Sequence, residues 1–220
     1  MTNPWQLRAV VFDLDGTLLD TLEHVARAFE RVTAEYGEPA SREQIIAAIG
    51  PPLADCYRLL LPAHDASVAA DKHHAFQQTD EFMQLITEYA GLRDMLRALH
   101  DKGIRAAIFT NRWRRGVDLI FSKLDLAREF DVIITPEDVR AGKPDPEGMH
   151  IIAGKLDLPE SSLMMVGDLP VDIAVGKNAG AGYTVGITHG FGTRESLAAA
   201  GADYVIDSLA QFSELVERLS

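Results

Sequence analysis

The sequence predicts an α/β fold in which a doubly wound parallel sheet carries an inserted subdomain made only of helices. Apolar runs typical of strands alternate with segments of helical periodicity over most of the chain, but one long stretch after the first such run shows helical patterns alone. The length, 220 residues, exceeds a typical single domain and falls short of two. We therefore expect a core at residues 1–18 and 89–220 and a helical insert at residues 19–88.

The first strand is expected at residues 8–12, where apolar and β-branched residues run continuously until two acids follow. Such a run is typical of a central parallel strand that is covered on both faces. A helix is then expected from about Thr21 to Tyr36, because one apolar stripe recurs there at spacings of three and four. Its members are Leu22, Val25, Ala26, Phe29 and Val32.

The rest of the insert also shows helical patterns. Gly50-Pro51-Pro52 and Pro62 interrupt them, and no alternation typical of a strand occurs between Leu19 and Glu88. His73 and His74 are adjacent, so on a helix their side chains diverge by about 100° and suit a solvated face better than a shared metal. The expected helices lie at about residues 42–49, 54–61 and 66–87.

Regular alternation of helix and strand begins at Tyr89 and continues to the end of the chain. This pattern predicts parallel strands joined by crossover helices. The expected strands are 104–109, 131–134, 163–166, 183–187 and a weaker one at 204–206. Helices are expected around residues 92–99, 117–124, 149–156 and 209–219, where apolar residues recur at helical spacing. One more helix is expected to end at Gly180.

Composition excludes several classes of protein. Thirty-three acidic against 21 basic residues give a net charge of −12, which argues against a nucleic-acid binder with a continuous basic face. No apolar run approaches the roughly 20 residues of a membrane span, and Met1 to Arg8 contains no apolar segment of signal-peptide type. Cys56 is the single cysteine, as expected in a reducing compartment. We expect a cytoplasmic protein with a small-molecule partner; no pattern indicates an oligomeric state.

Polar side chains follow several of the expected strands at the point where each one ends. Ligands of open α/β sheets bind at this carboxyl edge, so we expect these side chains to converge there. Any one of them alone would more commonly be a solvated acid, a helix cap or a loop lysine. The set comprises Asp13, Asp15, Thr110, Asn111, Lys143, Asp168 and Asp172.

The chemistry of this set points to phosphate and a hard cation. Asp13 and Asp15 lie two residues apart on an extended segment and share a face, so their carboxylates repel unless a cation or proton lies between them. Oxygen-only ligands favour Mg²⁺ over zinc. Gly16 lets backbone amides approach an anion, while Thr110 and Lys143 supply a hydrogen-bond donor and a positive charge for a phosphate.

The same residues resemble the four motifs of the haloacid dehalogenase-like hydrolase superfamily, in order and over essentially the whole chain. This resemblance implies a Rossmann-like core with a small helical cap between the first and second motifs, and it is closest to the phosphoglycolate phosphatase-like branch. One departure is Leu169, where many relatives carry a small hydroxyl residue. The matching segments are Asp13-Leu-Asp15-Gly16-Thr17, Thr110-Asn111-Arg112, Gly142-Lys143-Pro-Asp-Pro146 and Gly167-Asp168-x-x-x-Asp172.

The resemblance implies a role for each motif residue. Asp13 would be the nucleophile that forms an aspartyl-phosphate, and Asp15 would act as general acid and then general base. Mg²⁺ would be bound by the side chains of Asp13 and Asp168 and by the backbone carbonyl of Asp15. From its position about one helical turn beyond Asp168, Asp172 is expected to hold a metal-bound water or to orient Lys143. Phosphate would be bound by Gly16, Thr110, Asn111 and Lys143.

Three functions remain open at this point. The first is a Mg²⁺-dependent phosphatase of a small phosphorylated metabolite, with 2-phosphoglycolate as the leading substrate. The second is a phosphomutase similar to β-phosphoglucomutase, which carries a histidine where this chain has Val25, with His24 one place off. The third is a phospho-accepting receiver domain, which is about half this length and lacks the insert. Within the insert, Gly50-Pro51-Pro52-Leu53 is expected to contact the substrate or to join two helices.

Overall fold

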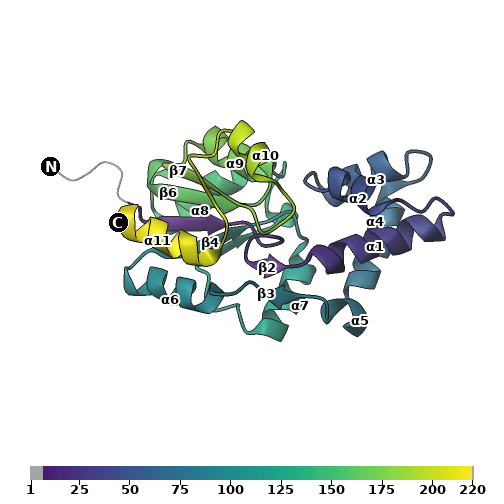
Figure 1. The fold of residues 1–220 in the computed structure, drawn as a ribbon, viewed down its shortest axis with the longest axis horizontal. Helices are drawn as coiled ribbons and strands as arrows, with labels where there is room; N and C mark the ends of the chain where they lie inside the picture. The colour runs from purple at the N-terminus through teal and green to yellow at the C-terminus, as the bar shows by residue number, and fades with distance from the viewer. Residues whose placement is uncertain (1–6, 220) are drawn as a thin grey trace.

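Six parallel strands form the central sheet of this computed structural model, which describes residues 7–219 (Figure 1). The spatial order is β5-β4-β1-β6-β7-β8. The predicted doubly wound parallel sheet is therefore confirmed, and each expected strand is present. Their bounds are β1 (Ala9–Phe12), β4 (Arg105–Phe109), β5 (Val132–Ile134), β6 (Leu163–Gly167), β7 (Tyr183–Ile187) and β8 (Tyr204–Ile206).

Two layers of helices cover the sheet because successive side chains of each strand point to opposite faces. Val10 and Phe12 of β1 pack on one side with helices α6 (Leu92–Asp101), α7 (Arg114–Leu124) and α11 (Leu209–Leu219). The intervening residues Ala9 and Val11 pack on the other side with α8 (Glu147–Leu156) and α9 (Pro170–Ala179). Shorter elements complete the core: the 3₁₀ turns η1 (Pro136–Asp138) and η2 (Glu160–Ser162), and α10 (Arg194–Ala199), which the sequence patterns did not predict.

The order of the strands fixes where a ligand can bind. After β1 the chain continues to β4 and β5 on one side, and after β6 it continues to β7 and β8 on the other. The connections diverge between β1 and β6, which is the point where open α/β sheets leave a crevice at their carboxyl ends.

The insert forms a separate group of helices beside this carboxyl edge (Figure 1). It buries its own apolar cluster, in which Phe29, Ile45 and Tyr57 are almost completely inaccessible. The predicted helix at 66–87 is wrong in its extent, because the chain turns at Gln78 and Thr79 and divides it in two. The helices are α1 (Leu22–Glu35), α2 (Arg42–Ala48), α3 (Leu53–Leu60), α4 (Ala66–Gln77) and α5 (Asp80–Met83).

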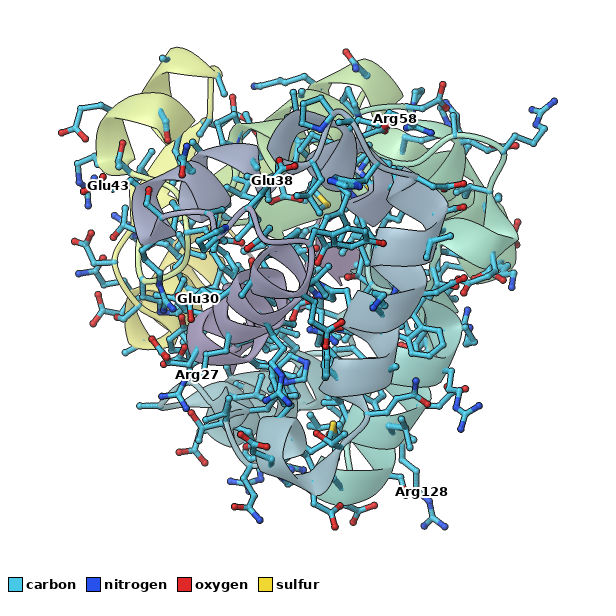
Figure 2. All side chains as sticks on the ribbon, turned by 90° about the vertical axis from the view of Figure 1, so that its right-hand side faces the viewer. Arg27, Glu30, Glu38, Glu43, Arg58 and Arg128 are labelled. Carbon is cyan, nitrogen blue, oxygen red and sulfur yellow. The ribbon has the colours of Figure 1, made fainter. Side chains whose placement is uncertain are left out.

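The outer side of the insert carries charged side chains of both signs. Figure 2 shows Arg27, Glu30, Glu38, Glu43 and Arg58 on this side of the molecule. Several are paired there, including Arg27 with Glu23 across one helical turn at 3.0 Å. This outer side is therefore solvated, and the insert is left to face the core with its other side.

Two short strands join the insert to the core. Leu19–Asp20 (β2) pairs antiparallel with Thr87–Glu88 (β3), so the outgoing and returning chains lie side by side. The expectation of no strand between Leu19 and Glu88 is wrong at these two ends. A two-residue strand is too short to show alternation, so the pattern gave no signal. The division of the chain at residues 19 and 88 stays a prediction.

No helix within residues 7–219 is long and apolar enough to cross a bilayer. Most of the segment Met1 to Arg8, in which the sequence shows no signal-type run, lies outside the described residues.

Candidate active site

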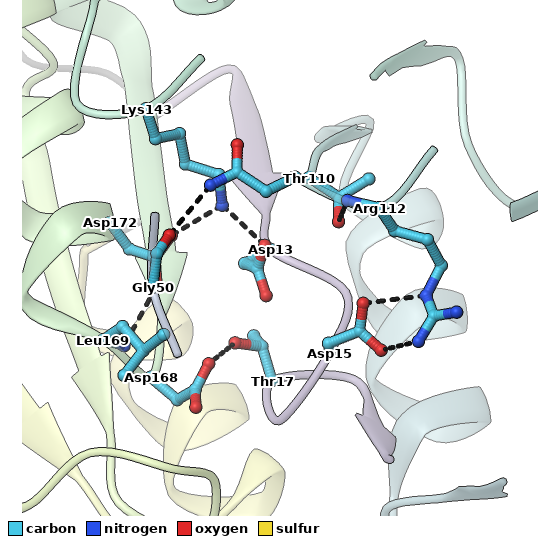
Figure 3. A network of polar contacts seen from close by, with 11 residues as sticks. Asp13, Asp15, Thr17, Gly50, Thr110, Arg112, Lys143, Asp168, Leu169 and Asp172 are labelled. Atoms are coloured by element: carbon cyan, nitrogen blue, oxygen red, sulfur yellow. Dashed lines mark hydrogen bonds and ion pairs between the residues drawn. The ribbon is translucent and has the colours of Figure 1, made fainter. Parts of the chain in front are cut away.

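Three strand ends meet at the carboxyl edge of the sheet and bring the predicted residues together (Figure 3). Asp13 follows β1, Asp168 follows β6, and Thr110 follows β4 on the other side of β1. The backbone continues the sheet just beyond the strands, since the Asp13 amide donates to the Val166 carbonyl at 2.8 Å. The position of each side chain therefore follows from strand pairing.

Asp13, Asp168 and Asp172 form a buried acidic group. One carboxylate oxygen from each lies within 4.8 Å of the others. Burial raises the pKa of Asp13 to about 7, although the charge of Lys143 opposes the shift and the carboxylates of Asp172 and Asp15 add to it. Burial, with the charges of Asp13 and Asp172, holds the pKa of Asp168 well above its usual value. The three carboxylates therefore carry more negative charge than the single ammonium of Lys143 can balance. Their oxygen-only donors fit a hard divalent cation such as Mg²⁺.

Asp168 is held by donors on both of its oxygens. The Thr17 hydroxyl donates to Oδ1 at 3.0 Å, and the Phe191 amide donates to Oδ2 at 2.7 Å. Gly16 passes beside this carboxylate with φ of +79°, and a Cβ atom there would lie 2.4 Å from Oδ2. Only glycine satisfies both the backbone angle and the close approach.

Lys143 connects two of the acids. Its Nζ atom lies 2.5 Å from Asp13 Oδ1 and 2.6 Å from Asp172 Oδ1, and all three side chains are buried. Burial disfavours the charged lysine, but the two carboxylates outweigh this cost and raise its pKa. The Leu169 amide holds the other oxygen of Asp172 at 3.0 Å. Asp172 thus holds Lys143 in place, one of the two roles expected from the sequence. The other role, holding a metal-bound water, stays a prediction.

Asp15 points away from the acidic group and pairs with Arg112 (Figure 3). Two guanidinium nitrogens donate to its two oxygens, at 2.6 and 2.8 Å. Burial works against ionisation of Asp15, but the charge and hydrogen bonds of Arg112 prevail, so the pKa of Asp15 lies below its usual value. The Asp15 carboxylate is therefore not among the clustered carboxylates, and metal binding by its backbone carbonyl stays a prediction.

The second motif lies between core and insert. The Thr110 hydroxyl accepts from the Arg112 amide at 3.0 Å and is almost fully buried. The Asn111 side chain donates to the Gly50 carbonyl at 3.0 Å, so it contacts the insert loop in this structure. Gly50, Pro51 and Leu53 line the same pocket as Asp13. Phosphate binding by Thr110 and Asn111 stays a prediction.

Some neighbours of the site were not expected from the sequence. His73 is 2% exposed and its Nδ1 atom lies 2.8 Å from the Tyr57 hydroxyl, so the prediction of a solvated His73-His74 face is wrong. His74 stacks on Trp113 with ring centroids 4.2 Å apart. Phe191 contributes a backbone amide to the site, so its side chain gives no signal in the sequence, and only the flanking Gly190 and Gly192 indicate a close approach of the backbone.

This edge suits reactions at phosphorus. A buried aspartate lies beside a lysine that can neutralise phosphate charge, and a second aspartate follows two residues later on a different side of the pocket. Phosphoryl transfer depends mainly on such positioning and charge neutralisation. The fold and the site thus define an enzyme of the phosphatase class.

Comparison with known proteins supports the assignment to the phosphatase class. The model of the haloacid dehalogenase-like hydrolases matches residues 10–185, and the chain belongs to this family. The pyrophosphatase PpaX of Bacillus velezensis is 30% identical over 206 residues, which are 93% of this chain and 94% of that protein.

Two solved structures show the same fold. A haloacid dehalogenase-like family hydrolase from Streptococcus pneumoniae matches with a TM-score of 0.85 at 21% identity, over 95% of this chain and 98% of that one. A protein from Haemophilus somnus, described as a predicted phosphoglycolate phosphatase, matches with a TM-score of 0.80 at 22% identity, over 97% and 99%.

Proposed function

We propose that this enzyme is a Mg²⁺-dependent phosphatase that hydrolyses a small phosphorylated metabolite through an aspartyl-phosphate on Asp13. The observation that carries the proposal is the placement of Asp13. Its carboxylate is buried between the carboxyl ends of β1 and β6. One of its oxygens accepts a hydrogen bond from Lys143, and Asp168 and Asp172 lie beside it. Among the described residues, none donates a hydrogen bond to its other oxygen.

The chain's own residues account for both halves of this reaction. Asp13 Oδ2 attacks phosphorus while the bond to the leaving oxygen breaks. Asp15 gives that oxygen its proton, which it takes up from solvent after it leaves Arg112, because the pair with Arg112 keeps it ionised. Asp15 then takes a proton from the water that attacks the aspartyl-phosphate, which releases phosphate and restores Asp13. Lys143 and the Thr110 hydroxyl neutralise and orient the phosphoryl oxygens.

The acidic group fits the cation that the resemblance implies. Asp13 and Asp168 would hold Mg²⁺ by their side chains, with the backbone carbonyl of Asp15. A bound Mg²⁺ supplies positive charge that lets the carboxylates and a phosphate dianion share one site. Thr17 and Phe191 would hold Asp168 in place for this purpose through one hydrogen bond to each of its oxygens.

Two substrates merit the first tests. One is 2-phosphoglycolate, which the resemblance favours. The other is inorganic pyrophosphate, because a relative that carries the name pyrophosphatase aligns over nearly the whole chain. A phosphomutase is less well supported: Val25 lines the pocket at the position of the mutase histidine, and His24 is buried against Phe82 and Arg112.

Phosphate release from a panel of phosphorylated metabolites, measured with Mg²⁺, tests the proposal. We expect many turnovers per protein with at least one small substrate, and none from Asp13→Asn, which also carries no phosphate label. Conversion of a sugar phosphate to its isomer would indicate the mutase instead. One retained phosphate per chain without turnover would indicate a receiver domain.

A further inference from the structure

The pocket between core and insert has an uneven distribution of charge. Among the described residues that line it, the acids Asp13, Asp15 and Asp172 all belong to the core. Two lining residues carry a permanent positive charge, Lys143 and Arg112. The insert contributes neutral groups alone, including His73 and Gln77 of α4.

The two cations serve different parts of the pocket. Lys143 is held between Asp13 and Asp172, at the place of the phosphoryl group. Arg112 lies on the other side of Asp13 and holds Asp15 (Figure 3). Because Asp15 protonates the leaving oxygen in the proposed reaction, the guanidinium that holds Asp15 belongs to the leaving-group side of the pocket. Arg112 is therefore the cation nearest to the leaving group.

The Arg112 side chain is fixed in this position. It is 4% exposed. One terminal nitrogen lies 3.4 Å from His24 Nε2 and 3.5 Å from Gln77 Oε1, both in the insert. The Nδ1 atom of His24 lies 2.9 Å from the Phe82 carbonyl, so Nδ1 carries the proton and Nε2 accepts from the guanidinium. A planar guanidinium held this way presents a fixed pair of donors, which matches a carboxylate or a phosphate.

We propose that Arg112 binds a second anionic group of the substrate, a carboxylate or phosphate on the leaving-group side of phosphorus, in exchange for Asp15. The second anionic group of such a substrate balances the positive charge of the guanidinium. Asp15 is then free to turn toward the leaving oxygen. A substrate with a neutral leaving group leaves Asp15 on Arg112. The inference rests on the proposed phosphatase function and narrows its substrates to compounds with two anionic groups.

Non-hydrolysable analogues test this directly. Methylphosphonate has one anionic group, whereas phosphonoacetate adds a carboxylate and methylenediphosphonate adds a second phosphonate. With wild-type protein in excess Mg²⁺, calorimetry should show one of the two larger analogues binding roughly 10- to 100-fold more tightly than methylphosphonate, the worth of a charge-assisted hydrogen-bond pair. Preference for phosphonoacetate would identify a carboxylate substrate, and preference for methylenediphosphonate a substrate with two phosphates.

Arginine variants assign the preference to one side chain. Arg112→Gln should reduce the affinity ratio to near one, and Arg112→Lys, which keeps the charge without the paired donors, should give an intermediate ratio. Arg115→Gln removes the same charge from an exposed position three residues away and should keep the wild-type ratio. An unchanged ratio in Arg112→Gln would overturn the proposal.

The wild-type measurement decides the matter even where a variant fails to fold. Equal affinity for all three analogues would overturn the role of Arg112 while leaving the phosphatase proposal intact. A protein that turns over no phosphate compound would instead contradict the phosphatase function, whatever the ratio of analogue affinities.

Discussion

Lys143 and Asp172 approach to 2.6 Å, although 29 residues separate them in the sequence and each side chain is 2% exposed. The pair spans the loop before α8 and the first turn of α9. Asp172 directs the ammonium group toward Asp13. The charge that we propose to meet the phosphate is therefore placed by a residue that need not touch the substrate.

Replacing Lys143 with Met should therefore depress turnover of every substrate together, because all of them share the phosphate. It should also lower the free energy of unfolding by about 3–5 kcal/mol, since two buried carboxylates lose their partner. Urea unfolding and a substrate panel measure the two effects. Leu53 lies at the start of α3 and lines the pocket from the insert. Leu53→Ala is the contrasting variant and should change the ranking of substrates. A uniform loss in Leu53→Ala would contradict this division of roles.

Turnover should depend on Mg²⁺ and disappear in EDTA. Thr17→Ala removes the hydroxyl that holds Asp168 at 3.0 Å, so the Mg²⁺ concentration for half-maximal rate should rise roughly 10- to 100-fold. Saturating Mg²⁺ should restore most of the rate. Thr17→Ser keeps the hydroxyl and should resemble the wild type; full activity in metal-free buffer would refute the cation's role.

Asp15→Asn should slow turnover by about 10²- to 10⁴-fold, the usual contribution of a general acid–base group. Asp13 remains able to accept the phosphoryl group, so a phosphorylated chain should accumulate with a substrate whose leaving group needs no proton. Intact-mass measurement after acid quench detects it. Absence of the added phosphate in Asp15→Asn, together with wild-type turnover, would exclude Asp15 from the chemistry.

Gly16→Ala should lower the free energy of unfolding by about 2–4 kcal/mol, because its Cβ atom would strike Asp168 and Phe191 at a positive φ. Gly37→Ala is a matched control: φ is +76° and no atom lies within 4 Å of the added Cβ. In the control, backbone strain alone should lower the free energy of unfolding, by about 1 kcal/mol. Equal losses at the two positions would show that the contact with Asp168 contributes nothing.

Acid should destabilise the fold through His24. Burial, together with the charge of Arg112, lowers the pKa of His24 to about 4, so the folded state resists a proton that the unfolded state accepts near 6.5. The stabilisation is complete above pH 6.5 and is lost as the pH falls toward 4. Buried Asp13 and Asp168 act in the opposite sense. The test is therefore the difference in unfolding free energy between wild type and His24→Asn, which should shrink by on the order of 2–3 kcal/mol across this window.

The sequence was sufficient to predict the residues at the strand ends. Asp13, Thr110 and Asp168 each follow an apolar run, and parallel strands bring their carboxyl ends to one edge whatever the loops do. The pattern of apolar residues in a strand is a local property of the sequence. It can be recognised without knowing which other elements pack beside the strand.

The sequence could not show contacts that depend on how the insert docks. Arg112 and Asp15 lie 97 residues apart, and their pairing is supported by His24 and Gln77 from two insert helices. The burial of His73 likewise depends on Tyr57, which belongs to a different helix. No local pattern records such packing.

The pairing of Leu19 with Glu88 bears on how this chain folds and diversifies. It closes the insert into a loop at its base, and the entropy of closing a loop grows only with the logarithm of its length, about 0.6 kcal/mol for each doubling. The central sheet can therefore form with inserts of very different lengths between β2 and β3. Lengthening, shortening or exchanging the helices beyond the β2–β3 pair would cost the core little. The part of the chain that we expect to select the substrate is therefore free to vary without disturbing the strand ends that carry Asp13 and Asp168.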